Sequence, residues 1–167
     1  IVANGNSVKK VIFPLEILPA TVMGAAAFHA AIAACILLAG VAIFSDGVHW
    51  TILWLPLLVL PLLLLSLGLA WFLAALGVFI RDTVQVTGVL ASVLMFLAPV
   101  FYPVSALPPE YRGLLYLNPL TFVIEQARAV VFAGTAPDFA WLALYYVVAL
   151  AVAQAGFWFF QKSRNGF

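Results

Sequence analysis

Most charged residues of this chain lie in short polar breaks between long apolar stretches. Hydrophobic residues make up 66% of the chain and charged residues only 8%, so the apolar stretches have no water-facing side. A helix that crosses a membrane needs about 20 apolar residues. The sequence therefore predicts an all-α membrane protein with a single transmembrane domain. Its four predicted transmembrane helices cover residues 20–44, 50–80, 84–101 and 139–160.

The segment after the third predicted span is interrupted by prolines, each of which removes a backbone donor and kinks a helix. Two short helices are expected in it. The first follows a pair of prolines and ends near Tyr116, and the second has Asn118 as N-cap, Pro119 as first residue and Phe132 as its end. Both are too short to span a membrane and too apolar for an aqueous loop. The sequence therefore predicts a re-entrant helical hairpin over residues 108–132.

A narrow polar stripe follows the second short helix. Thr121, Glu125 and Arg128 are spaced four and three residues apart, so they share one face of that helix. Glu125 and Arg128 are close enough to form an ion pair. If the two residues meet, exchanging the charges, Glu125→Lys with Arg128→Glu, is expected to restore part of what Glu125→Lys alone loses.

Residues 4–19 combine two lysines with more apolar surface than a plain turn needs. One interpretation is an interfacial juxtamembrane segment. The other is a short helix whose apolar side chains pack into a cytosolic partner. The chain has no initiator methionine, and its first three residues resemble the end of an earlier hydrophobic stretch. We therefore expect a chain that lacks its N-terminal part.

The chemistry-bearing side chains are few. His29 is expected to hydrogen-bond to a neighbouring helix, with a proton relay as the alternative, and Cys35 is expected to be a small core residue. His29 and His49 have no helix-spaced ligands beside them, so no metal site is predicted. No phosphate-binding GxxxxGK[ST] loop is present, and the basic clusters are too short to indicate a nucleic-acid partner.

Charge within the predicted spans is nearly absent, which disfavours an ion-coupled carrier. A transporter without an ion relay or a nucleotide site needs a partner that supplies the energy. A non-transporting membrane scaffold is a further alternative, although it would not require an irregular hairpin.

The basic residues indicate the orientation. If the spans alternate, five of them fall on one side of the membrane, and an excess of Lys and Arg marks the cytosolic side. Both ends are then cytosolic and the hairpin is exterior. The five residues are Lys9, Lys10, Arg81, Lys162 and Arg164.

Four motifs carry a resemblance to a known family. KKVIFPLEILP at 9–19, GVFIRD at 77–82, APVFYPVSALP at 98–108 and YLNPLTFVIEQAR at 116–128 occur in the family's order. Together they make the chain similar to the membrane subunit of type-2 ABC transporters, and most similar to the exporters of O-antigen, capsule or teichoic acid polysaccharides.

This resemblance implies a permease of six spans, of which the chain supplies the third to the sixth. It also implies a homodimer in the bacterial cytoplasmic (inner) membrane that moves a lipid-linked polysaccharide, as in lipopolysaccharide biosynthesis. Membrane lipids surround such a dimer, and two copies of a separate ABC ATPase bind ATP and Mg. The chain itself is then not an enzyme and holds no cofactor.

The resemblance assigns roles to two groups of residues. Part of the coupling segment 4–19 and the second cytosolic turn would contact the ATPase, and the two short helices would form an exterior gate. The ATPase-contact residues are Lys9, Lys10, Phe13, Pro14, Glu16, Arg81 and Asp82. The gate residues are Tyr111, Tyr116, Asn118, Pro119, Glu125 and Arg128.

Three aromatic residues near the end of the third predicted span are candidate glycan contacts, because sugar rings rest their apolar faces on aromatic side chains. They are Phe96, Phe101 and Tyr102. The alternative role for each is an interfacial belt or core packing. An exporter of small lipophilic molecules or drugs would share the same topology, so it stays an alternative function.

Overall fold

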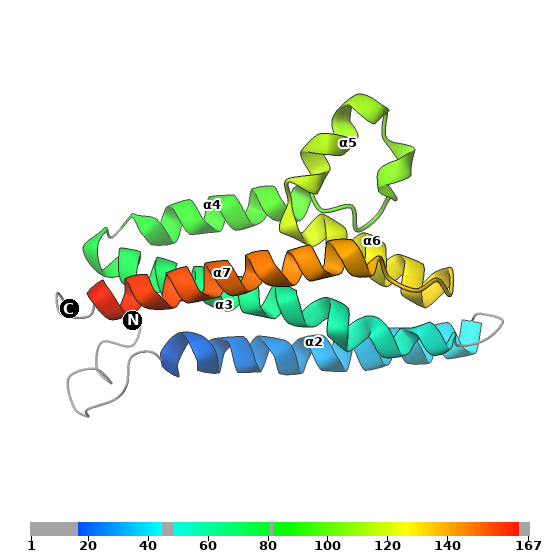
Figure 1. Ribbon diagram of the computed structural model, residues 1–167, viewed down its shortest axis with the longest axis horizontal. Helices are drawn as coiled ribbons and strands as arrows, with labels where there is room; N and C mark the ends of the chain where they lie inside the picture. Colours follow the sequence, from blue (N-terminus) through cyan, green and yellow to red (C-terminus); the bar gives the residue numbers. More distant parts are fainter. Residues whose placement is uncertain (1–16, 45–48, 81, 164–167) are drawn as a thin grey trace.

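The computed structural model describes residues 17–44, 49–80 and 82–163, and all regular structure within them is helical. Figure 1 shows long helices lying side by side, with one short helical segment projecting from them. The roles predicted for the first sixteen residues and for Arg81 fall outside the described residues. The helices in chain order are α2 (Ile17–Phe44), η2 (Trp50–Trp54), α3 (Leu55–Phe79), α4 (Thr83–Phe96), η3 (Val104–Ala106), α5 (Pro109–Tyr116), α6 (Pro119–Phe132) and α7 (Phe139–Ser163).

Three helical segments in the described part of the chain are long and apolar enough to cross a membrane. They are α2, the continuous η2–α3 segment Trp50–Phe79, and α7. They correspond to three of the four predicted spans, with ends that differ by three residues or fewer from residues 20–44, 50–80 and 139–160. Because α2 begins at Ile17, the last three residues of the predicted coupling segment belong to this long helix.

The helix in the third predicted span is shorter than expected. Residues 84–101 were predicted to form it, but α4 has 14 residues and ends at Phe96. At about 1.5 Å per residue it is roughly 21 Å long, which is less than the roughly 30 Å of a bilayer's hydrocarbon core. Pro99 and Pro103 explain the early end, because residues before a proline are disfavoured in the helical conformation.

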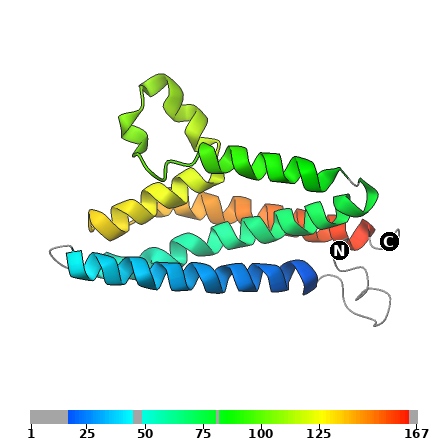
Figure 2. The ribbon, with the colours of Figure 1, turned by 180° about the vertical axis from the view of Figure 1, so that it is seen from behind.

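The core lies between α3 and α7, which pack side by side and run in the same direction (Figure 2). Their buried residues recur every three, four or seven positions, which places them on one face of each helix. Two glycines allow the backbones to meet: a Cβ atom on Gly68 would lie 2.6 Å from the Ala153 Cα, and one on Gly156 would overlap the Gly68 carbonyl. The buried residues are Leu58, Pro61, Leu65, Gly68 and Ala75 on α3, and Leu142, Ala149, Ala153, Gly156 and Phe160 on α7.

The proline inside α3 is compensated by α7. Pro61 has no N–H, so the carbonyl of Leu57, four residues earlier, loses its usual donor. The Tyr146 hydroxyl of α7 donates a hydrogen bond of 2.8 Å to this carbonyl. The neighbouring helix thus satisfies a backbone group that lipid cannot satisfy.

Figure 1 shows which chain segments share an end of the bundle. The beginning of α2, the junction between α3 and α4 and the end of α7 lie at one end, called here the 17/163 end. The end of α6 and the beginning of α7 lie at the opposite end, where the Thr51 hydroxyl donates to the Val130 carbonyl at 2.7 Å. Of the five basic residues in the orientation argument, Lys162 is the one that lies within the described residues, and it belongs to the last turn of α7 at the 17/163 end.

Helix α2 contacts α3 and buries only Pro19 and Val41 within the chain. Two expectations about its side chains are wrong. The His29 ring is hydrogen-bonded to the Ala25 carbonyl of its own helix at 2.8 Å, and Cys35 is exposed. Both residues are exposed, and the small-residue pattern of α2 did not indicate which of its faces meets a neighbouring helix.

Candidate functional site

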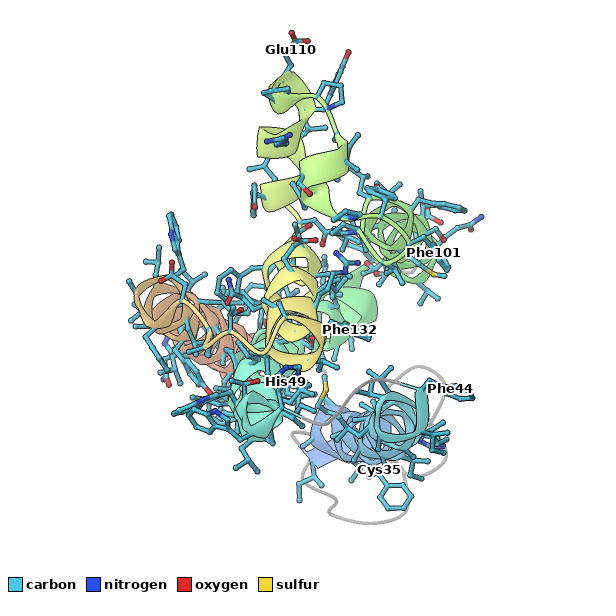
Figure 3. All side chains as sticks on the ribbon, turned by 90° about the vertical axis from the view of Figure 1, so that its right-hand side faces the viewer. Cys35, Phe44, His49, Phe101, Glu110 and Phe132 are labelled. Carbon is cyan, nitrogen blue, oxygen red and sulfur yellow. The ribbon has the colours of Figure 1, made fainter. Side chains whose placement is uncertain are left out.

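The candidate site is the proline-broken connection between α4 and α6. Helix α4 runs from the 17/163 end to the middle of the bundle, and α6 continues from there to the opposite end (Figure 1). Between them η3 and α5 project sideways, and Figure 3 shows Glu110 at the tip of this projection. The predicted boundaries of both short helices are confirmed, since α5 ends at Tyr116 and α6 covers Pro119–Phe132.

Asn118 joins the end of α4 to the beginning of α6. Its Oδ1 accepts a hydrogen bond from the Leu120 N–H at 3.0 Å, which confirms the predicted N-cap. Its Nδ2 donates to the Leu94 carbonyl at 2.7 Å, in the last turn of α4. Carbonyls in a last helical turn lack intrahelical donors. One buried side chain therefore satisfies backbone groups at the facing ends of two helices.

The predicted ion pair between Glu125 and Arg128 is present. It is part of a larger set of contacts, because Arg128 Nη2 also donates to the carbonyls of Pro99 and Val100 at 2.8 and 3.2 Å. Glu125 Oε1 accepts from the Val104 N–H at 3.3 Å. Both side chains of the pair therefore bind the backbone of the segment that follows α4.

These backbone contacts bear on the exchange of the two charges, which the spacing alone predicts to be partly restorative. A glutamate at position 128 has only acceptor oxygens when ionised, so it cannot donate to the Pro99 and Val100 carbonyls. The pair depends on its orientation as well as on its spacing.

Two further polar side chains in this region were not assigned a role from the sequence. Arg112 donates to the carbonyls of Leu107 and Ser105, both at 2.8 Å, and closes the loop before α5. The buried Thr121 hydroxyl donates to the Leu115 carbonyl at 2.6 Å. The sequence did contain a signal for the role of Arg112. Prolines leave backbone carbonyls without their usual donors, so an isolated arginine in an apolar, proline-rich segment indicates hydrogen bonds to such carbonyls.

The arrangement as a whole uses side-chain donors to replace missing backbone donors. Asn118, Arg112, Thr121 and Arg128 each donate to at least one main-chain carbonyl of residues 94–115. Such contacts hold an irregular backbone in one conformation where lipid offers no hydrogen bonds. The site is suited to positioning a rigid, non-spanning segment; within the described residues, no three His, Cys, Asp or Glu side chains are grouped as for a metal.

The aromatic residues assigned to the gate or to glycan contact lie at the surface of the chain. Phe96 and Phe101 are 84% and 97% exposed, while Tyr111 and Tyr116 are each 59% exposed. Tyr102 is half-buried. Core packing within this chain is therefore excluded for Phe96 and Phe101, which remain available to contact lipid, a partner or a substrate.

Of the predicted ATPase-contact residues, only Asp82 lies within the described part of the chain. Asp82 is exposed and immediately precedes α4 at the 17/163 end. The other six, Lys9, Lys10, Phe13, Pro14, Glu16 and Arg81, lie outside the described residues.

The apolar helices define the chain as a membrane protein, and its sequence identifies the family. Residues 1–132 match the family model of the ABC-2 type transporter, so the chain belongs to this family. This confirms the resemblance carried by the four motifs.

Several curated proteins are similar to the chain. The O-antigen export system permease protein RfbA of Myxococcus xanthus is 26% identical over 160 residues, which cover 95% of this chain and 62% of that protein. A protein of the same name from Klebsiella pneumoniae is 19% identical over 99% of the chain and 64% of its own length. The polysialic acid transport protein KpsM of Escherichia coli is 27% identical over 56% of the chain and 38% of its own length. The chain thus spans less than two thirds of the length of these relatives.

Proposed function

We propose that the protein is the channel-forming permease subunit of an ATP-driven exporter that moves a lipid-linked polysaccharide across the bacterial inner membrane. The observation that carries this proposal is the similarity to O-antigen export permeases over 95% of the chain. The similarity to a polysialic acid transport protein supports the same substrate class, a polysaccharide of the O-antigen, capsule or teichoic acid type. Export of a small lipophilic molecule is the alternative, because the family match alone fits both.

The energy would come from two copies of a soluble ABC ATPase, which bind ATP and Mg, and two copies of this chain would form the channel. The ATPase would contact the segment around Phe13 and the turn at Asp82. This proposed contact surface is supported by the fold, because the beginning of α2 and the connection from α3 to α4 lie together at the 17/163 end of the bundle.

The region from α4 to α6 would cross the membrane as a broken element with an exterior gate. Helix α4 would enter from the cytosolic side as the fifth span of the permease, and α5 with α6 would form the re-entrant hairpin over residues 108–132. The Asn118 contact between the ends of α4 and α6 supports this proposal. Exposed aromatic residues at this junction, Phe96 and Phe101, would offer apolar faces to passing sugar rings.

Loss of the apolar contact with the ATPase should abolish export. With Phe13→Asp in the protein co-expressed with its ATPase, we expect normal membrane insertion but no co-purification of the ATPase and no ATP-dependent glycan export. A lone carboxylate in an apolar groove costs several kcal/mol, on the order of the penalty for an unpaired charge. Phe13→Leu is the matched control and should retain both activities. A normal yield of complex with Phe13→Asp would contradict the proposed contact, and export of lipophilic dyes without glycan export would favour the alternative substrate.

Cysteine labelling tests the proposed orientation. In a Cys35→Ala background, a cysteine at Glu110 should react with a membrane-impermeant thiol reagent added outside intact cells. A cysteine at Lys162 should react only after the membrane is opened, because positive-inside topology places it in the cytosol. The opposite labelling pattern would show that the bundle is inverted.

A further inference from the structure

A groove of about 650 Å³ runs along the surface between α6 and α7, bordered by the end of α5. It lies apart from the contacts between Arg128 and the segment after α4. Its lining comprises Tyr116, Asn118, Pro119, Phe122, Gln126, Asp138, Trp141, Leu144, Tyr145 and Val148.

The groove has the length of one membrane leaflet. Along α7 it extends from Asp138, at the beginning of the helix, to Val148. Ten residues of α-helix rise about 15 Å, half of the roughly 30 Å hydrocarbon core of a bilayer. Because α7 begins at the end of the bundle opposite the 17/163 end (Figure 1), the groove extends from that end toward the middle of α7.

The two ends of the groove differ in chemistry. At the Val148 end of the groove, called here the deep end, two of the polar side chains are already paired: the Tyr145 hydroxyl donates to the Pro119 carbonyl at 3.1 Å, and Asn118 is bonded through both side-chain polar atoms. The groove there also offers apolar surface to a ligand, supplied by Phe122, Leu144 and Val148 and bordered by the exposed Tyr116.

The shallow end offers polar groups. Asp138 uses Oδ1 to accept from the Ala140 and Trp141 N–H groups, and it is exposed. Gln126 accepts a hydrogen bond from the Asp138 N–H through Oε1, so its amide nitrogen can donate hydrogen bonds to a ligand. Trp141 is 61% exposed, as is usual for tryptophan at a membrane surface. Asp138 is the single charged residue in the groove lining, and it is negative.

We propose that this groove binds one phospholipid with a primary-amine headgroup, such as phosphatidylethanolamine, in the exterior leaflet. An acyl chain fills the apolar deep end, the ammonium group pairs with Asp138, and the Gln126 amide donates to a phosphate oxygen. A lipid with an anionic headgroup finds no cationic side chain in this lining and is repelled by the Asp138 carboxylate, so it binds less well. The leaflet assignment rests on the proposed orientation; the lipid site itself does not depend on transport.

Native mass spectrometry of the purified complex tests the site with phosphatidylethanolamine and phosphatidylglycerol of the same acyl chains. The wild type should retain the ethanolamine lipid roughly threefold to fivefold better, the preference expected of one exposed ion pair. Asp138→Asn should remove this preference, because asparagine keeps the helix cap but not the charge. Equal retention by the wild type, or an unchanged preference in Asp138→Asn, would overturn the headgroup assignment.

A second pair of variants tests the acyl-chain part. Leu144→Trp should fill the groove and reduce retention of both lipids, while Leu150→Trp, on the same helix and exposed outside the lining, should retain them as the wild type does. Unchanged retention in Leu144→Trp would overturn the groove. Displacement of the lipid by a soluble, uncharged hexose oligosaccharide would instead identify a glycan site and overturn the lipid proposal. These binding measurements stay informative whether or not the complex exports polysaccharide.

Discussion

Replacing Gly68 with leucine should separate α3 from α7 and leave little folded protein. A Cβ atom at this position would lie 2.6 Å from the Ala153 Cα and 2.7 Å from the Ala153 nitrogen, and both are backbone atoms that cannot rotate away. The cost should therefore exceed the roughly 1–3 kcal/mol of ordinary overpacking. Gly156→Leu should have the same effect, because its Cβ would overlap the Gly68 carbonyl. Thermal unfolding in detergent and the yield of monodisperse protein measure the loss.

Gly77 provides a matched control on the same helix. A Cβ atom added there would meet no atom within 4 Å, so Gly77→Leu should be produced and unfold like the wild type. Similar losses in Gly68→Leu and Gly77→Leu would mean that any large residue in α3 is harmful. Normal unfolding of Gly68→Leu would show that the α3–α7 contact is looser than the glycines indicate.

Replacing Arg128 with methionine should disorder the segment after α4 and stop export. The change leaves Glu125 without its ion-pair partner and removes the donor to the Pro99 and Val100 carbonyls. Loss of the partly buried hydrogen bond to the Pro99 carbonyl should cost about 1.5–3 kcal/mol, the usual value for a hydrogen bond to a charged group, and loss of the exposed bond to the Val100 carbonyl should cost less. We therefore expect a clearly lower unfolding temperature, new protease cleavage between α4 and α6, and export near background, with membrane insertion unchanged.

Two controls separate the charge from the shape of the guanidinium. Arg128→Lys retains the positive charge but lacks the planar fork that reaches Glu125 and the carbonyls together, so it should restore only part of the stability. The exchange of Glu125→Lys with Arg128→Glu should fail to restore it, because glutamate cannot donate to the carbonyls. Full recovery in this double variant would show that the ion pair alone matters and that the backbone contacts are incidental.

The local features of the hairpin could be predicted from the sequence. The cap at Asn118, the start of α6 at Pro119 and the pairing of Glu125 with Arg128 depend on residues at most four positions apart. Helical geometry alone places such residues together. The long apolar helices were predictable for a similar reason, since a run of apolar residues of that length favours a spanning helix wherever it lies.

The tertiary structure decided which distant groups meet. The contacts of Asn118 with Leu94 and of Arg128 with Pro99 join residues 24 and 29 positions apart, so they depend on the path of the chain through the proline-rich segment. The same path ends α4 at Phe96, short of the predicted span. Periodicity also did not reveal that Gly68 and Gly156 face each other or that Cys35 faces outward. A glycine, an asparagine or a cysteine in an apolar helix has the same local propensity on every face, and only packing against a neighbouring helix distinguishes one face from another.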